Sequence, residues 1–311
     1  MSEVRSIHQR RRCPNETVKS ILLTYLTLDA EMDWHQGNIP TCKIPEWSPG
    51  MQANATFFGD PKFGKTYFEL ENSSQEFGNR WRSAIGNWDD KIVVDIGCGP
   101  GNLYAAVGGS PQAIIGVDIS YGALEHAIEL GYIPLLADAH HLPLIDEFAD
   151  IVMLNATLHH CDRMAEALAE AARLVRPGGV LITDEDPLAD TRTHTGLSAL
   201  ILRLHKRFPL YWLPWRTALS KSPEEQAFRL ATEIHNSKPG DGTTPEFYAK
   251  ILAPRGFTIE LYPHYHNVGA ELFQGKPGRL GLKDILVQKL AAPDAPDPPQ
   301  SIGCIARKLL S

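Results

Sequence analysis

The feature that most constrains the fold is a regular alternation of short apolar runs and helix-period segments between Lys91 and about Pro187. Consecutive valines and isoleucines predict buried strands, whereas apolar residues three and four positions apart predict amphipathic helices. The predicted strands in this region cover 91–96, 113–118, 133–138, 149–154 and 180–186. Because the connections between them are short, the pattern predicts a doubly wound, Rossmann-like α/β fold with a mostly parallel sheet and helices on both faces.

Capping residues in the same region predict where the helices begin and end. Ser120 is predicted to cap a helix over 121–130, and Gly131 to end it. Asp162 is predicted to cap the next helix, which the sequence "RPGG" at 176–179 closes.

The flanking segments add further elements. Thr244 is predicted to cap a helix with Pro245 at its first position, and "FTIELY" (257–262) and "IGCIARK" (302–308) are predicted to be two closing strands, which makes seven strands in all. One helix is predicted near the N-terminus from apolar residues at helical spacing, namely Val18, Ile21, Leu22, Tyr25 and Leu26.

We therefore divide the chain into an N-terminal helical or cap segment, 1–80, and one α/β domain, 81–311. Residues 187–242 form an insertion with no clear strand, and 264–300 form a long, proline-rich loop before the last strand. The apolar stripe and aromatic residues of the insertion predict a lid over the carboxyl ends of the strands. Two alternatives stay open for it, a helical pair packed on the sheet edge and a surface that docks on a membrane.

Composition narrows the class of partner and the compartment. The net charge of −7 argues against a broad nucleic-acid-binding face, which needs basic residues. The five cysteines are odd in number and show no C-x-x-C spacing, so we expect reduced thiols. We find neither an apolar run long enough for stable membrane insertion nor a signal-peptide core, and we expect a cytoplasmic protein.

The loop after the first strand of the α/β region, "VVDIGCGPGN" at 93–102, carries glycine at three alternate positions. A glycine-rich turn at this place in the fold is typical of a nucleotide-cofactor site. The dinucleotide pattern G-x-G-x-x-G fails because Asn102 stands where the third glycine belongs, and the phosphate-loop pattern fails because no Gly-Lys-Ser/Thr follows.

The string D-x-G-x-G-x-G instead resembles the first motif of class I methyltransferases, which use S-adenosylmethionine. The segments "GVDIS" (116–120), "ADAHHLPL" (137–144), "FADIVMLNATLHH" (148–160) and "RLVRPGGVLIT" (173–183) resemble later motifs of this family in order and spacing. The match covers about 91–187, and "PEFYAKILAPRGFTIEL" resembles the last helix and sixth strand of the family. Within the family, the sequence is most similar to small-molecule O-methyltransferases of the natural-product type.

The resemblance implies S-adenosyl-L-methionine as the cofactor and gives roles to particular residues. Asp95 is expected near the ammonium of the amino-acid tail, Asp118 at the ribose hydroxyls, and the pair Asp138-Ala139 at the adenine. Cys98 is expected to pack within the loop and not to act as a nucleophile. The complete predicted cofactor set is Asp95, Gly97, Cys98, Gly99, Gly101, Asp118, Ile119, Asp138, Ala139 and Asn155.

Candidate residues for the chemistry follow the fourth and fifth strands. In relatives of this kind a histidine of the "LHH" sequence is a plausible general base, which here gives His160 first and His159 second. Glu185 or Asp184 is expected to orient the imidazole. The acids at 184–186 also suit magnesium, but acids at a strand end are commonly solvated, so we assign no metal.

These observations predict an enzyme that methylates a hydroxyl of an apolar or aromatic small molecule in natural-product biosynthesis. The alternatives are a C-methyltransferase acting on a quinone-like or lipid ring, and a non-catalytic binding protein with the same fold. A nucleotide-dependent oxidoreductase is disfavoured by Asn102. The sequence leaves the acceptor, the methylated atom and the oligomeric state open.

Overall fold

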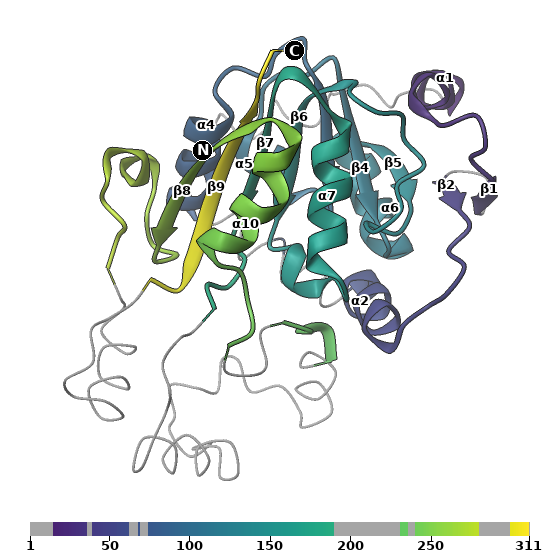
Figure 1. The fold of residues 1–311 in the computed structure, drawn as a ribbon. Coiled ribbons are helices and arrows are strands. Elements are labelled where there is room, and N and C mark those ends of the chain that lie inside the picture. Colours follow the sequence, from purple (N-terminus) through teal and green to yellow (C-terminus); the bar gives the residue numbers. More distant parts are fainter. Residues whose placement is uncertain are drawn as a thin grey trace, which may run out of the picture.

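The computed structural model describes residues 15–35, 39–61, 68, 74–189, 231–235, 240–279 and 299–310, which are arranged around one sheet (Figure 1). Among these residues the sheet has nine strands in the order β1-β2-β5-β4-β3-β6-β7-β9-β8. The strands are β1 (Met32–His35), β2 (Ile39–Cys42), β3 (Ile92–Ile96), β4 (Ala113–Asp118), β5 (Ile133–Leu136), β6 (Ala149–Asn155), β7 (Val175–Asp184), β8 (Phe257–His264) and β9 (Ser301–Lys308).

The middle of the sheet has the predicted doubly wound, parallel arrangement. β3 lies between β4 and β6 and pairs in parallel with both, so the chain winds outward from β3 in two directions. β5 and β7 extend the parallel set, and β9 and β8 close one edge as antiparallel strands. In open α/β sheets, ligands bind outside the carboxyl ends of the strands where the winding reverses, which is here between β3 and β6.

The sheet has two more strands than the seven predicted, and both come from the first 80 residues. β1 pairs antiparallel with β2, and β2 joins β5 in parallel. Each strand has only four residues, too few to show a clear alternation, and β2 contains Pro40, which is unusual within a strand.

Helices lie on both sides of the sheet (Figure 1). The α-helices of the described residues are α1 (Asn15–Tyr25), α2 (Pro49–Gly59), α4 (Gln75–Ile85), α5 (Asn102–Val107), α6 (Tyr121–Leu130), α7 (Met164–Leu174) and α10 (Pro245–Leu252). Three short 3₁₀ helices are η2 (Leu158–His160), η4 (Ala253–Arg255) and η5 (Ala270–Gln274). The predicted N-terminal helix is therefore confirmed as α1.

Two predicted caps are confirmed and one is wrong. The Ser120 hydroxyl accepts a hydrogen bond from the Ala123 amide, and the Thr244 hydroxyl accepts one from the Phe247 amide. α7, however, begins after Arg163 and has no side-chain cap. The Asp162 carboxylate instead accepts a hydrogen bond from the Ser48 hydroxyl at 2.6 Å, and so connects the start of α7 to that of α2.

The helix α7 ends just before the sequence "RPGG" at 176–179 as predicted, but these four residues lie within β7, which begins earlier than the predicted strand over 180–186. Ala149 of β6 pairs with Val175, whereas Ile151 pairs with Val180, so the register shifts across these residues. Gly178 has a φ of 74°, a left-handed value that glycine adopts without strain. The glycines therefore accommodate an irregularity in a long strand.

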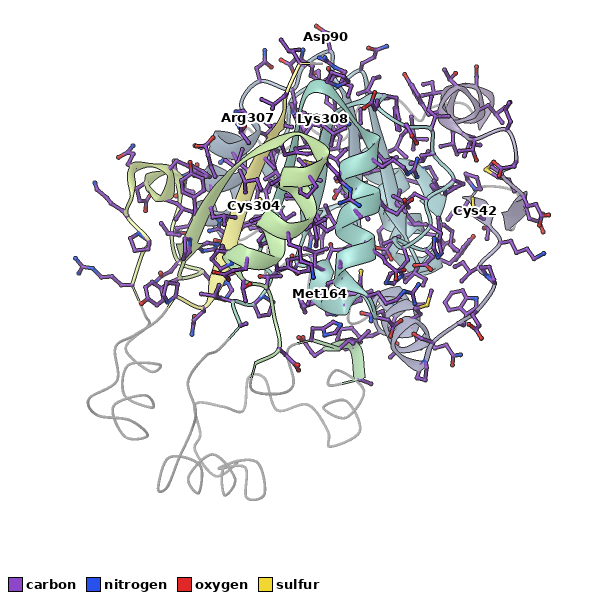
Figure 2. The ribbon with its side chains drawn as sticks, in the orientation of Figure 1. Cys42, Asp90, Met164, Cys304, Arg307 and Lys308 are labelled. Atoms are coloured by element: carbon purple, nitrogen blue, oxygen red, sulfur yellow. The ribbon has the colours of Figure 1, made fainter. Side chains whose placement is uncertain are left out.

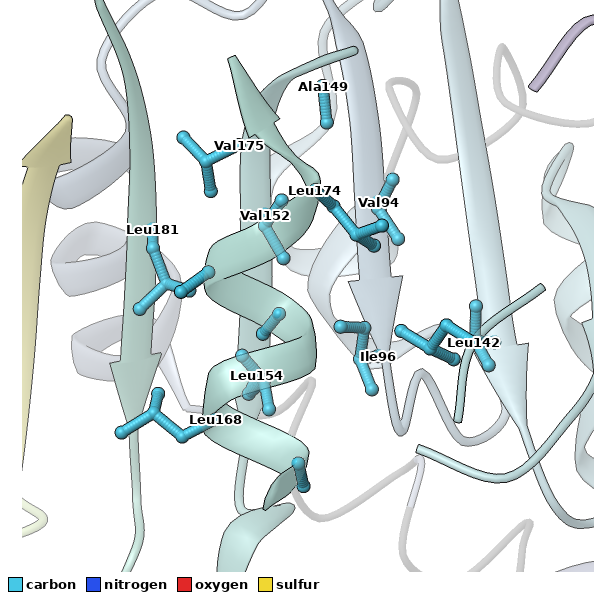
Figure 3. Close-up of a cluster of buried hydrophobic side chains, with 14 of the residues drawn as sticks. Val94, Ile96, Leu142, Ala149, Val152, Leu154, Leu168, Leu174, Val175 and Leu181 are labelled. Carbon is cyan, nitrogen blue, oxygen red and sulfur yellow. The ribbon is translucent and has the colours of Figure 1, made fainter. Parts of the chain in front are cut away.

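Alternating side chains of the strands form two hydrophobic cores, one on each face of the sheet. In β3, Val94 and Ile96 point to one face and Val93 to the other. Figure 3 shows the first core, in which Leu174 of α7 lies beside Val94 of β3, and Leu168 lies toward β7, the strand of Leu181. α10 and Leu22 of α1 also contribute to this core, whereas α4, α5 and α6 cover the opposite face.

The two ends of the parallel strands are distinct in the structure. Asp90, just before β3, marks the amino end, and Met164, at the start of α7, lies at the opposite, carboxyl end beside α2 (Figure 2). Most of the predicted lid and of the long loop, namely 190–230, 236–239 and 280–298, lies outside the described residues. The division of the chain at residue 80 stays a prediction. Within the described residues we find no helix long and apolar enough to span a bilayer.

Candidate active site

A cavity lies at the carboxyl ends of the parallel strands, beside the point where the winding reverses. The loops after β3, β4, β5 and β6 form one side of it, and α2 contributes Met51, Asn54 and Phe58 to the other. The space is about 860 Å³ when the part open to solvent is included, within the range of cavities that hold small ligands. The predicted cofactor residues that line it are Asp95, Gly97, Cys98, Gly99, Asp118, Ile119, Asp138, Ala139 and Asn155.

The three glycines of the loop after β3 have different structural roles, although all have positive φ angles. A Cβ on Gly97 would lie 2.5 Å from the Thr157 side chain, and a Cβ on Gly101 would lie 2.7 Å from Leu130. Packing within the protein therefore requires glycine at these two positions. A Cβ on Gly99, which lines the cavity, would meet no atom of the described residues within 4 Å, so packing does not require glycine there and the space beside its Cα is open to a ligand. Gly101, a predicted cofactor residue, does not line the cavity.

Asp118 is the last residue of β4 and is held by two backbone amides. Its carboxylate oxygens accept hydrogen bonds from Gly99 N–H and Ser120 N–H, both at 2.8 Å. Burial raises the pKa of Asp118, and these amides partly counteract the rise. The bonds fix the carboxylate at the edge of the cavity, where it can accept further hydrogen bonds from ligand hydroxyls.

Asp95 is the second-last residue of β3 and is buried where it lines the cavity. One carboxylate oxygen accepts a hydrogen bond from the Tyr132 hydroxyl at 2.7 Å, while the other has no partner among the described residues. Burial is the main cause that raises the pKa of Asp95 to about 7; Tyr132 lowers it and the nearby Asp118 raises it.

Three asparagine side chains share this situation. Asn102 and Asn155 line the same side of the cavity as Asp95, and Asn54 lines the side formed by α2; the Oδ1 atom of each is buried and accepts no hydrogen bond within the described part of the chain. Leaving a buried acceptor unsatisfied costs free energy, so four such acceptors in one cavity indicate a ligand that donates hydrogen bonds. The ammonium of an amino-acid tail supplies three donors and a positive charge. The residues present therefore fit S-adenosylmethionine.

The segment after β5 carries Asp138, Ala139 and His140. The Asp138 carboxylate accepts from the His140 ring, with 2.5 Å between Oδ1 and Nδ1, while Nε2 of the same ring accepts from the Arg163 amide. These partners require the neutral imidazole with its proton on Nδ1. Burial raises the pKa of Asp138, but the hydrogen bonds from His140 outweigh it, so the pKa lies below its usual value.

Cys98 and Cys161 also line the cavity. Burial raises the pKa of Cys98 well above its ordinary value and that of Cys161 as well. Both are therefore neutral thiols at pH 7, and thiolate nucleophiles are not expected here.

The two candidate histidines occupy η2, which follows β6. His160 lines the cavity, and its Nδ1 lies 2.7 Å from the Thr232 carbonyl oxygen. His159 is buried behind it and does not line the cavity; its Nδ1 lies 2.9 Å from Oδ1 of Asp186. The structure thus presents His160, and not His159, to a ligand.

The expectation that Glu185 or Asp184 orients the histidine is wrong. Glu185 contacts Arg80 and His266, and Asp184 lies 2.7 Å from both Arg80 Nε and His264 Nε2. Glu185 has a left-handed φ of 62°, which turns the chain between Asp184 and Asp186. Consequently Asp186, and not its neighbours, points toward the histidine pair.

Several residues of the site had no signal in the sequence. Asn54 and Phe58 come from a helix more than thirty positions before the glycine loop, and Thr232 and Glu233 come from a short segment far after η2. No motif relates these segments, because only the tertiary fold brings them together.

Comparison with known proteins bears on this geometry. Residues 94–183, from β3 to the end of β7, match the family described as "Methyltransferase domain". This segment of the chain is therefore similar to a methyltransferase domain. The parallel, doubly wound strands, the glycine loop and the acid at the end of β4 agree with the resemblance to class I methyltransferases that the sequence shows.

Three curated relatives show how far the similarity reaches. A malonyl-[acyl-carrier protein] O-methyltransferase from Yersinia pestis is 28% identical over 151 residues, 48% of this chain and 54% of that protein. A tRNA (carboxymethyluridine(34)-5-O)-methyltransferase from Arabidopsis thaliana is 39% identical over 97 residues, 30% of this chain and 23% of that protein. A demethylmenaquinone methyltransferase from Mycobacterium marinum is 29% identical over 176 residues, 54% of this chain and 72% of that protein.

The chain spans about half the length of the first curated relatives that it matches. The names of these three relatives specify three different methyl acceptors, so similarity alone does not identify the acceptor of this protein.

Proposed function

We propose that this protein transfers a methyl group from S-adenosylmethionine to a small-molecule acceptor. The observation that carries the proposal is the set of unsatisfied acceptors in the cavity, of which three, on Asp95, Asn102 and Asn155, lie on the side opposite α2. When bound, S-adenosylmethionine supplies a methyl group activated by a positively charged sulfur.

In this proposal, different residues of the cavity bind the ammonium, the ribose and the adenine of the cofactor. Asp95, Asn102 and Asn155 accept hydrogen bonds from the ammonium, while Gly99 leaves its backbone accessible beside them. Asp118 accepts from the ribose hydroxyls, and Asp138, Ala139 and Ile119 bound the adenine.

For the acceptor we propose a hydroxyl of an apolar or aromatic metabolite. Met51 and Phe58 give the cavity apolar surface next to His160, and the rings of Phe58 and His160 are 5.5 Å apart between centroids. The Thr232 carbonyl holds the proton on Nδ1 of His160, which leaves the lone pair of the ring on Nε2. His160 is therefore the first candidate for a general base, and the buried His159 the second.

A cytoplasmic role in natural-product biosynthesis completes the proposal; the net charge of −7 supports a small molecule over a nucleic acid.

Calorimetry tests the cofactor. S-adenosylhomocysteine, the demethylated product, should bind the purified protein, and NAD should not. Asp118→Ala should weaken binding by roughly 2–3 kcal/mol because charge-assisted hydrogen bonds to two hydroxyls are lost. Glu129→Ala, an exposed acid on α6, is the matched control and should leave binding unchanged. Tight NAD binding without any response to S-adenosylhomocysteine would refute the proposal.

A turnover assay with a panel of hydroxylated acceptors tests the base. His160→Ala should lower kcat by about 10²–10⁴-fold with little change in cofactor affinity. His159→Ala is measured in the same assay, because His159 is the second candidate although it does not line the cavity. Equal, near-normal turnover in both variants would mean that the acceptor needs no base from this pair.

A further inference from the structure

A cluster of three ligand-type side chains lies beside the acceptor end of the cavity, which it reaches through His160. His159, His160 and Glu233 each offer one ligand atom, and these atoms lie within 4.8 Å of one another. Nε2 of His159 is 3.6 Å from Oε2 of Glu233, and the two imidazole rings are 4.0 Å apart between centroids. Two imidazoles and one carboxylate are a donor set suited to divalent transition metals, with coordination positions left for other ligands.

The hydrogen bonds behind the cluster are those that metal-binding histidines need. Nδ1 of His159 faces the carboxylate of Asp186, and Nδ1 of His160 faces the Thr232 carbonyl. Both partners are acceptors, so each imidazole donates from Nδ1 and carries its lone pair on Nε2. A carboxylate or a backbone carbonyl in this position orients a ligating ring and increases its basicity.

The charge around the cluster also favours a cation. Asp186 is completely buried, its Oδ2 accepts no hydrogen bond within the described residues, and it pairs there with His159 and with no lysine or arginine. Glu233 adds a second carboxylate. By contrast, the other group of this kind, Asp184, Glu185 and His264, already contains the guanidinium of Arg80. A divalent ion would neutralise the first cluster but is unnecessary in the second.

We propose that His159, His160 and Glu233 bind one divalent transition-metal ion, with Asp186 and the Thr232 carbonyl as the groups that orient the two imidazoles. The ion presents its remaining positions to the cavity and there holds an oxygen atom of the acceptor. This last use rests on the proposed function, and it specifies an acceptor with a metal-binding hydroxyl or carboxylate. Because the ion takes the lone pair of His160, the imidazole is not the base while the ion is bound; the ion instead lowers the pKa of a bound hydroxyl, whose proton passes to solvent water before the oxygen takes the methyl group.

Cobalt(II) titration of the chelator-treated, full-length protein tests the site directly, since the visible spectrum of cobalt reports its ligands. We expect one equivalent to bind. Glu233→Gln should weaken the binding at least tenfold, and Asp186→Asn should weaken it about 10–100-fold through the orientation of His159. His126→Ala, which removes an exposed histidine on α6, is the matched control and should bind as the unmodified protein does.

Circular dichroism and S-adenosylhomocysteine binding of each variant show that the fold and the cofactor site are intact. No cobalt uptake by the unmodified protein would overturn the proposal, whatever the variants do. Uptake that Glu233→Gln leaves unchanged, or a thiolate charge-transfer band from Cys98 or Cys161, would overturn it as well. If the protein binds the cofactor but not cobalt, the metal site is refuted and the proposed function stands. If it binds cobalt but not the cofactor, the proposed function is refuted and the metal site stands.

Discussion

The raised pKa of Asp95 predicts that the affinity of the protein for its proposed cofactor depends on pH. Burial raises its pKa to about 7, so in the ligand-free protein the group takes up a proton as the pH falls below that value. A ligand ammonium pairs with the ionised form, and below about pH 7 binding must therefore displace this proton. Affinity for S-adenosylhomocysteine should fall by up to about tenfold per pH unit as the pH decreases below the pKa.

Calorimetry across this pH range with the unmodified protein and Asp95→Asn measures the effect. The variant should bind more weakly at neutral pH and should lose the dependence on pH, because its amide does not titrate. If both proteins show the same slope, another group controls it and Asp95 does not contact the ammonium.

At the scale of single residues, the sequence allowed prediction of those site residues that lie at the end of a strand or just after it. Asp118 and Asp138 each come after a buried apolar run, and parallel strands bring their carboxyl ends to one edge of the sheet. The orientation of the acids after β7 was not predictable, because the left-handed φ of Glu185 redirects the next side chain. A non-glycine residue with positive φ leaves no reliable mark in a sequence.

Among the secondary-structure elements, α4 is fixed by a buried arginine. Arg80 is 2% exposed, and its guanidinium contacts Asp184 and Glu185 at the end of β7 and the carbonyl of Val268 after β8. Burial raises the pKa of Asp184, but Arg80 and His264 outweigh it and hold the pKa well below its usual value. The ion pair thus joins α4 to the antiparallel edge of the sheet.

Arg80→Met should lower the free energy of unfolding by roughly 3–5 kcal/mol, because it leaves a buried carboxylate without its cation. Urea denaturation at neutral pH measures the change. Arg82→Met, on the exposed side of the same helix, should stay within about 0.5 kcal/mol of the unmodified protein. Similar losses in the two variants would mean that His264 alone compensates Asp184.

Elements were predictable where local and global preferences agree. α6 has the predicted cap, length and terminal glycine, since Ser120 and Gly131 satisfy its ends by local hydrogen bonds. β1 and β2 escaped prediction because strands of four residues depend on their neighbours in the sheet. Residues 176–179 were likewise not predicted as strand, because they lie between two stretches of β7 that pair with β6, Val175 and Val180–Asp184, and do not pair with β6 themselves.

For the whole molecule, the site depends on the meeting of three segments that are far apart in the chain. Nδ2 of Asn54, on α2, lies 2.9 Å from the carbonyl oxygen of Gly50, 3.5 Å from that of His160 and 3.4 Å from that of Thr232. One amide group thus links α2, the histidine pair and the segment that carries Glu233. The doubly wound sheet was predictable from local patterns, but this junction was not, because no local pattern encodes it.

Asn54→Ala should separate these segments without harming the cofactor side of the cavity. Losing hydrogen bonds to two distant carbonyls should destabilise the fold by roughly 1–3 kcal/mol. Amide hydrogen exchange should become faster in 158–161 and 231–235, while affinity for S-adenosylhomocysteine stays unchanged because Asp95 and Asp118 remain in place. Gln52→Ala, on the exposed face of the same helix, is the control and should exchange as the unmodified protein does. Unaltered exchange in Asn54→Ala would show that packing of Phe58 against His160, and not the Asn54 amide, holds the acceptor end together.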